Sequence, residues 1–180
     1  MKKIVIIVGS SGSGKNTIID ALKVRDDFVN AVTDATREPR PGDKEGVTYY
    51  FISETEFKIR KAEGKYIDTT FYSGSYRGLR KEELDKKLAT NKNVLLIMDK
   101  NGVVNLKSIY GDDVVAINIT CPIEVQVQRM RARGDSEDAI AERVAYYNEN
   151  ETNNNDYCDV VIENVGSVED TVEKIVSYLN

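Results

Sequence analysis

The segment at residues 3–19, Lys-Ile-Val-Ile-Ile-Val-Gly-Ser-Ser-Gly-Ser-Gly-Lys-Asn-Thr-Ile-Ile, constrains the fold more than any other part of this sequence. It opens with mostly β-branched apolar residues, which predict a strand buried on both faces. Gly9, Gly12 and Gly14 follow, and their missing side chains let backbone N–H groups approach an anion closely. Lys15 adds a positive charge, and residues 17–19 begin a helix whose N-terminus favours negative charge. The segment therefore predicts a strand, a phosphate-binding loop and a helix in succession.

The loop matches the P-loop pattern G-x-x-x-x-G-K-[ST], except that Asn16 follows the lysine. Because an apolar strand precedes the loop and an apolar helix follows it, a nucleotide-phosphate site is favoured over an ordinary glycine-rich turn. Asn16 replaces the hydroxyl that would contact magnesium, so its amide oxygen, Thr17 or a water would have to substitute. The candidate phosphate-binding residues are Gly9, Ser10, Ser11, Gly12, Ser13, Gly14, Lys15, Asn16 and Thr17.

The composition narrows the classes of protein to which this chain can belong. Its 180 residues suit one domain, and with 41% hydrophobic and 31% charged residues we expect a soluble globular protein. The longest apolar runs are of strand length, so we expect no membrane span. A formal net charge of −5 argues against general nucleic-acid binding, which normally requires a basic face.

Histidine and cysteine content restricts the chemistry further. The chain has no histidine, which excludes Ser-His or Cys-His catalysis and histidine metal sites. Phosphoryl transfer remains open, because it depends on positioning and charge stabilisation more than on a histidine base. Cys121 and Cys158 are far apart and lack metal-ligand spacing, so we expect free thiols and a cytoplasmic protein.

Apolar runs and capping signals predict alternating strands and helices along the rest of the chain. Strands are predicted at residues 28–32, 46–52, 65–72, 93–99, 114–119 and 158–162, and a glycine-containing turn at 73–78. Helices are predicted after the P-loop, from Ser53 to about residue 63, at 80–89, after Pro122, after Gly134 and after Ser167. This order predicts an α/β three-layer P-loop fold with a parallel central sheet, and its nucleotide should bind beyond the carboxyl ends of the strands. The mixed middle third predicts a small lobe inserted into that sheet.

Three further groups of charged residues are candidates for phosphate or metal binding. Arg37 and Arg40 lie in a proline-stiffened loop that suits bidentate phosphate binding, although two solvated surface arginines fit this stretch equally well. Asp99 ends an apolar strand, as the magnesium-binding aspartate of a Walker B pattern does; alternatively it caps the turn that follows. The last group suits a lid over transferring phosphates, or else a solvated face, and comprises Arg129, Arg131, Arg133 and Arg143.

Several motifs together resemble the guanylate kinase family of P-loop nucleoside monophosphate kinases, nearly from end to end. The most specific is Thr36-Arg37-Glu-Pro-Arg40-Pro-Gly42, because P-loops alone occur in many folds. The others are residues 9–15, 46–51, 99–102, 129–134 and 161–164. The resemblance implies a core at residues 1–32, 90–120 and 158–180, a monophosphate-binding lobe at 33–89 and a helical lid at 121–157.

The resemblance also implies roles for individual residues. The catalytic residues would be Lys15, Arg37, Arg133 and Arg143. The acceptor would contact Thr33, Arg37, Arg40, Tyr49, Asp68 and Arg77. ATP would contact the P-loop residues, Arg129 and Asn164, the last of these near the adenine. Mg2+ would be held by Asp99 with Asn16 or Thr17.

The chain departs from the family at positions that recognise the base. Thr33 and Asp68 conservatively replace a serine and a glutamate. Residues 77–79, Arg-Gly-Leu, replace Tyr-Gly-Thr or Tyr-Gly-Ser, and Ile97 replaces the first aspartate of Asp-x-Asp. Loss of one carboxylate contact would lower guanine affinity by about ten- to a hundredfold. Arg77 is a candidate third cation on the acceptor phosphate, in place of the missing tyrosine.

We therefore expect an ATP- and magnesium-dependent kinase of GMP or dGMP, acting as a monomer or homodimer. A second interpretation is a related kinase of another acceptor, such as a modified purine monophosphate or ribose 1,5-bisphosphate; Leu79 and Ile97 favour it, whereas Arg37 and Arg40 favour a nucleotide. A third is a non-catalytic guanylate-kinase-like domain that binds protein partners. The joint presence of Lys15, Asp99, Arg133 and Arg143 argues against the third.

Overall fold

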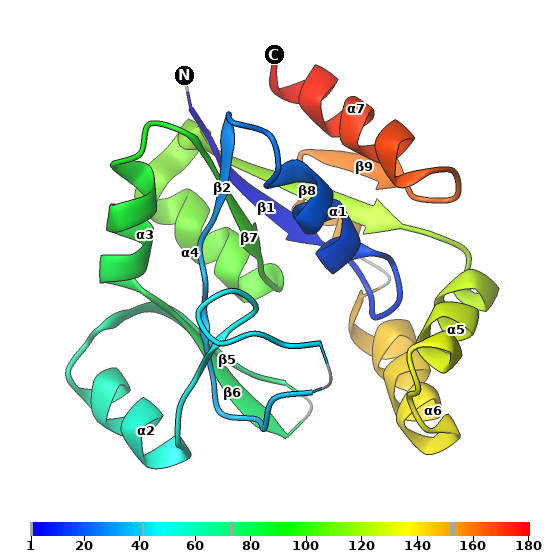
Figure 1. The fold of residues 1–180 in the computed structure, drawn as a ribbon, viewed down its shortest axis with the longest axis horizontal. Helices are drawn as coiled ribbons and strands as arrows, with labels where there is room; N and C mark the ends of the chain where they lie inside the picture. The colour runs from blue at the N-terminus through cyan, green and yellow to red at the C-terminus, as the bar shows by residue number, and fades with distance from the viewer. Residues whose placement is uncertain (1, 41, 73, 152–153) are drawn as a thin grey trace.

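A parallel five-stranded sheet forms the centre of the computed structural model, which describes residues 2–40, 42–72, 74–151 and 154–180 (Figure 1). Its strand order is β2-β7-β1-β8-β9, and each neighbouring pair is parallel. The strands are β1 (Ile4–Val8), β2 (Phe28–Asn30), β7 (Asn93–Ile97), β8 (Val114–Thr120) and β9 (Val160–Glu163). The predicted fold class, α/β with a parallel central sheet, is confirmed.

Strand β1 lies in the middle of this sheet and directs the chain into the P-loop. All five of its residues are buried, as expected for a strand with neighbours on both edges and helices on both faces. Ile4 lies beside Val94 of β7 and Val114 of β8. Because these strands are parallel, their carboxyl ends share one edge of the sheet, and the loops that follow them meet there.

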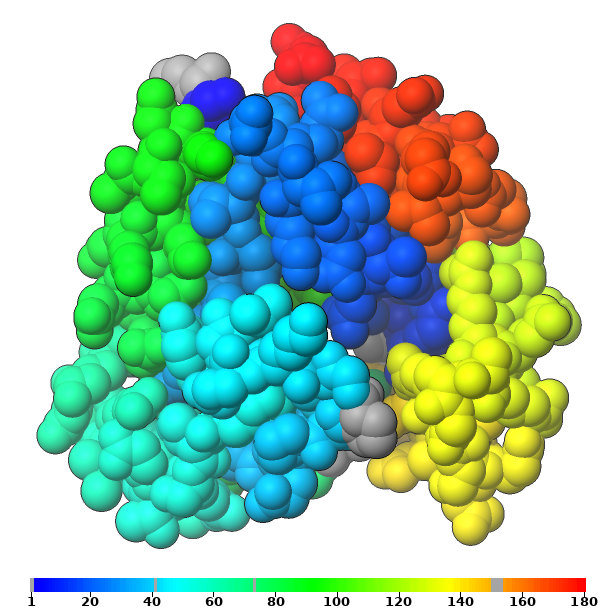
Figure 2. Space-filling model, in the orientation of Figure 1, coloured from blue at the N-terminus to red at the C-terminus, as the bar shows by residue number. Residues whose placement is uncertain are grey.

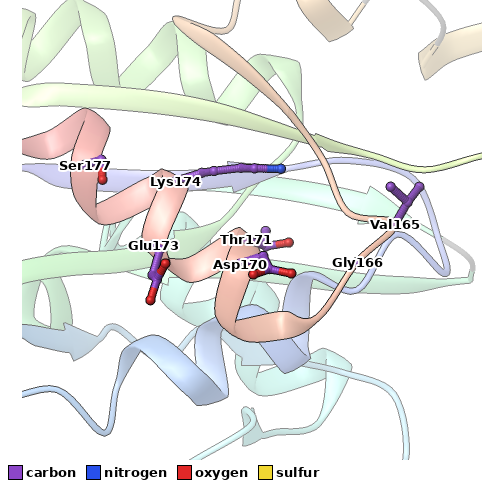
Figure 3. Close-up of a pocket in the computed structure, with 7 residues that line it drawn as sticks. All are labelled: Val165, Gly166, Asp170, Thr171, Glu173, Lys174 and Ser177. Carbon is purple, nitrogen blue, oxygen red and sulfur yellow. The ribbon is translucent and has the colours of Figure 1, made fainter.

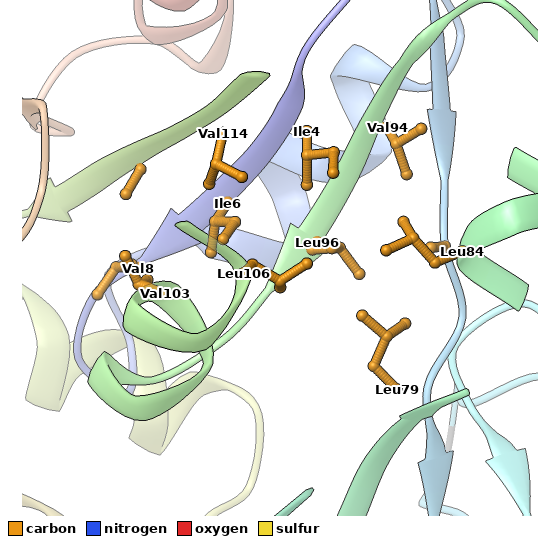
Figure 4. Close-up of a cluster of buried hydrophobic side chains, with 12 residues drawn as sticks. Ile4, Ile6, Val8, Leu79, Leu84, Val94, Leu96, Val103, Leu106 and Val114 are labelled. Atoms are coloured by element: carbon orange, nitrogen blue, oxygen red, sulfur yellow. The ribbon is translucent and has the colours of Figure 1, made fainter. Parts of the chain in front are cut away.

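Alternate side chains of β1 pack against two different helical layers. Ile4 and Ile6 belong to a buried cluster with side chains of α3 and α4 (Figure 4). Val5 and Ile7 belong to a second cluster with side chains of α1 and α7. The helices are α1 (Lys15–Leu22), α3 (Lys81–Leu88), α4 (Lys100–Tyr110) and α7 (Val168–Leu179). The period-two alternation of a strand thus supplies a hydrophobic face to each layer.

A second, four-stranded sheet is inserted between β2 and β7, with strand order β4-β3-β6-β5. With helix α2 we call it the small lobe, and its elements are β3 (Asp34–Ala35), β4 (Tyr50–Phe51), α2 (Glu54–Ala62), β5 (Tyr66–Tyr72) and β6 (Ser75–Arg80). The carboxylate of the fully buried Asp34 accepts hydrogen bonds from Arg60 at 2.7 Å, Tyr66 at 2.7 Å and Arg80 at 3.0 Å. This network ties β3 to α2, β5 and β6, because a buried carboxylate must be paired to be tolerated.

Two helices that follow β8 lie across from the small lobe. These are α5 (Ile123–Ala132) and α6 (Glu137–Tyr146), which we call the helix pair. Figure 2 shows the helix pair and the small lobe on opposite sides of a hollow below α1. Short helical turns complete the chain at Gly111–Asp113, Tyr147–Glu151 and Asn154–Asp156. Within the described residues, no helix combines the length and apolar character needed to cross a membrane.

Two predictions in the small lobe are wrong in extent. The strand predicted at 46–52 shortens to β4, because Gly46 has a φ of 68° and its N–H donates to the Tyr49 carbonyl in a tight turn. The turn predicted at 73–78 is strand β6 from residue 75 onward, while residue 73 lies outside the described residues. Gly78 suits this strand because a Cβ there would lie 2.7 Å from the ring of Tyr66.

Candidate functional site

The P-loop backbone can be built only with glycine at its three glycine positions. Gly9, Gly12 and Gly14 have φ values of 145°, 85° and 101°, which L side chains rarely adopt. Space is also lacking: a Cβ on Gly9 would lie 2.4 Å from the Ile119 carbonyl oxygen, and one on Gly14 would lie 2.4 Å from the Asn164 amide nitrogen. The loop is thus packed directly against β8 and the segment after β9.

Lys15 begins α1 and turns back over the loop. Its Nζ donates to the carbonyl oxygens of Gly9 at 2.6 Å and Ser10 at 2.8 Å. The N-cap residue, Gly14, has a left-handed backbone, and residues 15–18 include no acid that would compete with an anion at the helix N-terminus. The arrangement offers backbone N–H groups and one ammonium group to a phosphate.

Arg129 and Asn164, both predicted to contact ATP, form hydrogen bonds with the backbone of the P-loop. Arg129 donates to the carbonyl oxygens of Gly12 at 3.3 Å, Ser13 at 3.2 Å and Asn164 at 3.2 Å. The Asn164 amide donates to Ser13 O at 2.8 Å and accepts from the Thr171 hydroxyl at 3.1 Å. Because Asn164 is only 3% exposed, its observed role is to fix the loop; contact with ATP stays a prediction.

Arg37 and Arg40 are placed together by Asp43. Arg37 Nη1 and the Arg40 backbone N–H each lie 2.7 Å from Asp43 Oδ2. Burial opposes the charged form of Asp43, but the hydrogen bonds from Arg37 and Arg40 outweigh it and hold the pKa of Asp43 below its usual range. The Arg37 guanidinium also lies 5.1 Å above the centre of the Tyr49 ring, and the Arg77 guanidinium lies 5.2 Å from the same ring. The small lobe therefore presents Arg37 and Arg77 at one tyrosine ring, with the Arg40 backbone held near Arg37 by Asp43.

Arg133 and Arg143 of the helix-pair region share a second aspartate. Asp135 accepts hydrogen bonds from Arg133 Nε at 3.0 Å and Nη2 at 2.6 Å, and also from Arg143. Burial opposes ionisation of Asp135, but the hydrogen bond and charge of Arg133, with the charges of Arg143 and Arg40, lower its pKa. Arg133 Nη2 also reaches the Ser11 hydroxyl of the P-loop at 3.3 Å.

The small lobe and the helix pair bring their arginines toward each other. Burial lowers the pKa of Arg40, and so do the positive charges of Arg37, Arg143 and Arg133, while Asp135 opposes them. Arg40 therefore interacts electrostatically with Arg37 of the small lobe and with Arg133 and Arg143 of the helix-pair region. Such a concentration of guanidinium groups suits a polyanion that carries several phosphates.

Comparison with known proteins identifies the family. A family model described as guanylate kinase matches residues 1–180. The chain belongs to the guanylate kinase family. It is 30% identical over 98% of its length to the guanylate kinase of Chlorobium chlorochromatii, covering 96% of that protein. It is 35% identical over 98% of its length to a guanylate kinase of Clostridium perfringens, covering 82% of that protein.

Solved structures agree on the fold. The crystal structure of guanylate kinase from Anaplasma phagocytophilum gives a TM-score of 0.71 at 24% identity, covering 99% of this chain and 84% of that one. Shikimate kinase from Acinetobacter baumannii gives a TM-score of 0.51 at 14% identity, with 99% and 93% covered. The family match confirms the prediction that this chain is a nucleoside monophosphate kinase of the guanylate kinase family. It supports an enzyme rather than a non-catalytic binding domain.

The positions that depart from the guanylate kinase pattern are largely packed inside the protein. Leu79 is 1% exposed and belongs to the cluster of Figure 4, and Ile97 packs against the second cluster. Thr33 is half-buried, and its carbonyl accepts from the Tyr50 N–H at 3.0 Å. Leu79 and Ile97 thus contribute apolar packing where the family pattern has polar groups, which leaves Thr33 and Asp68 as the polar candidates for base recognition.

Asp68 and Asp99 are the two acidic residues predicted for the site, and their charges interact. Burial and the negative charge of Asp99 raise the pKa of Asp68, against a hydrogen bond from Asn105. Asp99 Oδ2 accepts from the Thr70 hydroxyl at 2.7 Å, and Oδ1 accepts from the Gly102 N–H at 3.1 Å, which caps α4. The capping alternative for Asp99 is therefore observed, and it gives rise to a helix that the sequence patterns do not predict.

Asp99 can still take part in magnesium binding. The described residues include no group of three or more histidine, cysteine or acidic side chains that could hold a metal alone. Mg2+ in kinase sites needs fewer protein ligands, because one or two carboxylates, waters and substrate phosphates complete its shell. Each Asp99 oxygen keeps lone-pair capacity beside its single hydrogen bond, and Asn16 and Thr17 are exposed at the start of α1. This donor set fits a phosphate-bound magnesium ion.

A groove of about 640 Å³ runs along α7 and the residues just before it (Figure 3). Thr171, which binds the Asn164 amide oxygen, forms part of its wall. Its lining residues are Val165, Gly166, Asp170, Thr171, Glu173, Lys174 and Ser177. The groove adjoins the segment where the family resemblance places adenine.

Sequence reasoning missed two groups that organise the site. Gln126 is 3% exposed; its side chain accepts from the Ser10 hydroxyl at 2.7 Å and donates to the Cys121 carbonyl at 2.9 Å, which joins α5 to the P-loop. Asp34 lies in a two-residue strand, and no sequence pattern marks it as buried. A polar residue at an apolar position of a helix could have signalled Gln126, whereas only the fold reveals the partners of Asp34.

Proposed function

We propose that this protein transfers the γ-phosphoryl group of ATP to GMP or dGMP. Family membership supports an ATP-dependent guanylate kinase activity. The observation that carries the proposal is the convergence of two arginine pairs with the P-loop. Arg37 and Arg40 come from one side and Arg133 and Arg143 from the other, each pair held by its own aspartate. An acceptor phosphate and the ATP phosphates would meet between them.

The chain is organised for this reaction as a core, an acceptor lobe and a lid. We assign residues 1–32, 90–120 and 158–180 to the core, 33–89 to the monophosphate-binding lobe and 121–157 to the lid. Closure of lobe and lid would exclude water, so that the acceptor phosphate rather than water receives the phosphoryl group. Because the proposed residues come from a single chain, the site needs no second copy.

In this proposal, residues of the P-loop and of the lid both stabilise negative charge on the phosphates. The P-loop backbone would bind the ATP phosphates, and Lys15 would neutralise charge on the transferred group. Arg133, which forms a hydrogen bond with the Ser11 hydroxyl, and Arg143 would contact the transferred phosphoryl group from the lid. A magnesium ion held through Asp99, with Asn16 or Thr17 nearby, would supply charge neutralisation to the ATP phosphates.

The acceptor is expected to bind along the small lobe. Arg37, Arg40, Tyr49 and Arg77 would hold its phosphate. Asp68 and the Thr33 hydroxyl would contact the base, and a carboxylate accepts hydrogen bonds from the N–H edge of guanine. Of the two free thiols, Cys121 lies beside the P-loop, with its Sγ 3.9 Å from Gly12 O and 3.7 Å from Arg129 Nη1, and free thiols are what a reducing cytoplasm would maintain.

A substrate panel tests the proposal. ADP release with Mg-ATP should be measured against GMP, dGMP, AMP, CMP, UMP, dTMP and ribose 1,5-bisphosphate. Turnover of GMP or dGMP far above the others is expected. Activity with another acceptor alone would show that the packing of Leu79 and Ile97 accompanies a changed specificity, and would overturn the guanine assignment but not the kinase fold.

A further inference from the structure

A row of aromatic rings and guanidinium groups links the proposed acceptor-phosphate site to the helix pair. Arg37 and Arg77 lie 5.1 and 5.2 Å from the centre of the Tyr49 ring. Arg77 also lies 5.7 Å from the centre of the Tyr72 ring. The Tyr72 ring then meets the Tyr146 ring edge-on, with centroids 5.3 Å apart and an interplanar angle of 79°. We call Tyr49, Arg77, Tyr72 and Tyr146 the aromatic bridge.

The aromatic bridge crosses between parts of the chain that are distant in sequence. Tyr72 ends β5, Arg77 lies in the adjacent strand β6, and Tyr146 ends α6. Tyr146 follows Arg143 by three residues, so both side chains lie on the same face of α6. The tyrosine that touches the small lobe and the arginine proposed to contact the transferred phosphate are therefore positioned by the same helical turn.

Arg77 is held by rings rather than by a carboxylate. The Nε atoms of Arg77 and Arg37 are both buried without a hydrogen-bond partner among the described residues. Arg37 has Asp43 as its counter-ion, whereas the ion pairs found in the described part of the chain do not include Arg77. A guanidinium between two ring faces keeps its in-plane N–H donors available for an anion. Its orientation thus depends on Tyr49, on Tyr72 and on any phosphate that it binds.

We propose that the aromatic bridge positions the lid in response to the acceptor phosphate. A phosphate bound by Arg77 fixes that guanidinium against Tyr72, and Tyr72 in turn fixes Tyr146 and the end of α6. A bound acceptor phosphate thereby stabilises the arrangement in which Arg143 faces the transferring group. Tyr72 and Tyr146 are positioning residues in this scheme. The inference rests on the proposed function, because it assumes that the small lobe binds a phosphate monoester.

Replacement of Tyr146 by leucine tests the bridge in catalysis. Tyr146→Leu should lower kcat for GMP by about 3- to 10-fold, the contribution of one aromatic pair. It should also raise ATP hydrolysis relative to transfer, because a poorly placed lid admits water. Tyr146→Phe keeps the ring and should restore both values. The matched control is Phe71→Leu, the same kind of change at an exposed neighbour on the opposite face of β5.

A double-mutant cycle distinguishes coupling from independent packing effects. Arg77→Met should raise the KM for GMP and also lower kcat. Because the two residues act through one row of contacts, Tyr146→Leu added to Arg77→Met should cause no further loss of kcat. Independent, multiplicative losses would overturn the proposal. So would a Tyr146→Leu enzyme whose kcat and hydrolysis match those of Phe71→Leu.

A third measurement does not depend on turnover. Saturating inorganic phosphate should slow amide hydrogen exchange in α6 of the wild-type protein, and this protection should be absent in Arg77→Met and Tyr72→Leu. Equal protection in the wild type and these variants would contradict the bridge. A wild-type protein that fails to phosphorylate GMP yet shows Arg77-dependent protection of α6 would contradict only the proposed function.

Discussion

Lys15 is the residue whose charge the fold places most directly at the P-loop. Its ammonium group lies 2.6 Å from Gly9 O and 2.8 Å from Ser10 O, inside the loop that would hold the ATP phosphates. Lys15→Ala should lower kcat by about 10²- to 10³-fold, because a preorganised charge on the transferring group is lost. Steady-state ADP release measures this effect, and a thermal melt checks that the fold is intact.

The control for Lys15 is Lys23→Ala at the other end of α1, where the lysine pairs with Asp20 near the surface. This change should leave kcat within about twofold, because an exposed ion pair contributes little. If Lys15→Ala also kept near wild-type turnover, the assignment of the P-loop to ATP would be wrong.

Asp68 should give acceptor recognition a distinctive pH dependence. Burial and the charge of Asp99 raise the pKa of Asp68 above its ordinary value of 3.8, so its carboxylate is protonated at a higher pH than usual. A protonated Asp68 accepts fewer hydrogen bonds from guanine, so kcat/KM for GMP should fall as the pH falls through that raised pKa. In Asp68→Asn this component should vanish, leaving only the titration of the substrate phosphate. Profiles of identical shape would remove Asp68 from base recognition.

Strand β6 depends on a glycine that brings it close to two aromatic rings. A Cβ on Gly78 would lie 2.7 Å from the Tyr66 ring and 3.0 Å from the Phe57 ring. Gly78→Ala should therefore reduce the free energy of unfolding by about 1–3 kcal/mol through overpacking, measured by denaturant titration. Thr55→Ala, on the exposed side of α2, should change it by less than about 0.5 kcal/mol. A Gly78→Ala protein as stable as Thr55→Ala would show that the rings can move aside.

The helices and strands that could be predicted are those whose local sequence pattern indicates which side chains are buried and where the element begins. Strand β1 follows from an unbroken apolar run, and α7 from Ser167, whose side chain and that of Asp170 form a reciprocal capping box. Strand β6 could not be predicted, because Gly78 is a turn signal locally and a close-packing residue only once Tyr66 lies beside it. Helix α4 could not be predicted, because Asp99 fits both the end of a strand and the N-cap of a helix.

At the scale of the whole molecule, sequence patterns predict candidate site residues but not the contacts that hold them. The P-loop and the Arg37–Arg40 segment have motifs that follow from their own chemistry. Nothing local indicates that Asp135 joins two arginines or that Arg77 lies between Tyr49 and Tyr72. The ring contacts of Arg77 and the link from Asp135 to Arg143 depend on the folded chain, because sequence patterns do not show which side chains of neighbouring elements will meet.

The charge of the whole molecule opposes its substrates, while the charge of the site attracts them. The formal net charge is −5, yet the charges of Arg37, Arg133 and Arg143 all act on Arg40. At contact distance the local arginines outweigh the dispersed negative charge, because interactions beyond about 10 Å are screened at about 0.1 M salt. Raising NaCl from about 0.05 to about 0.5 M should therefore increase the KM for GMP severalfold, with a smaller change in kcat. Arg40→Gln should start from a higher KM and respond less steeply to salt, since one of the screened contacts is already gone. A KM that stays constant or falls with salt would mean that the negative charge of the molecule, and not the arginine cluster, governs how the acceptor binds.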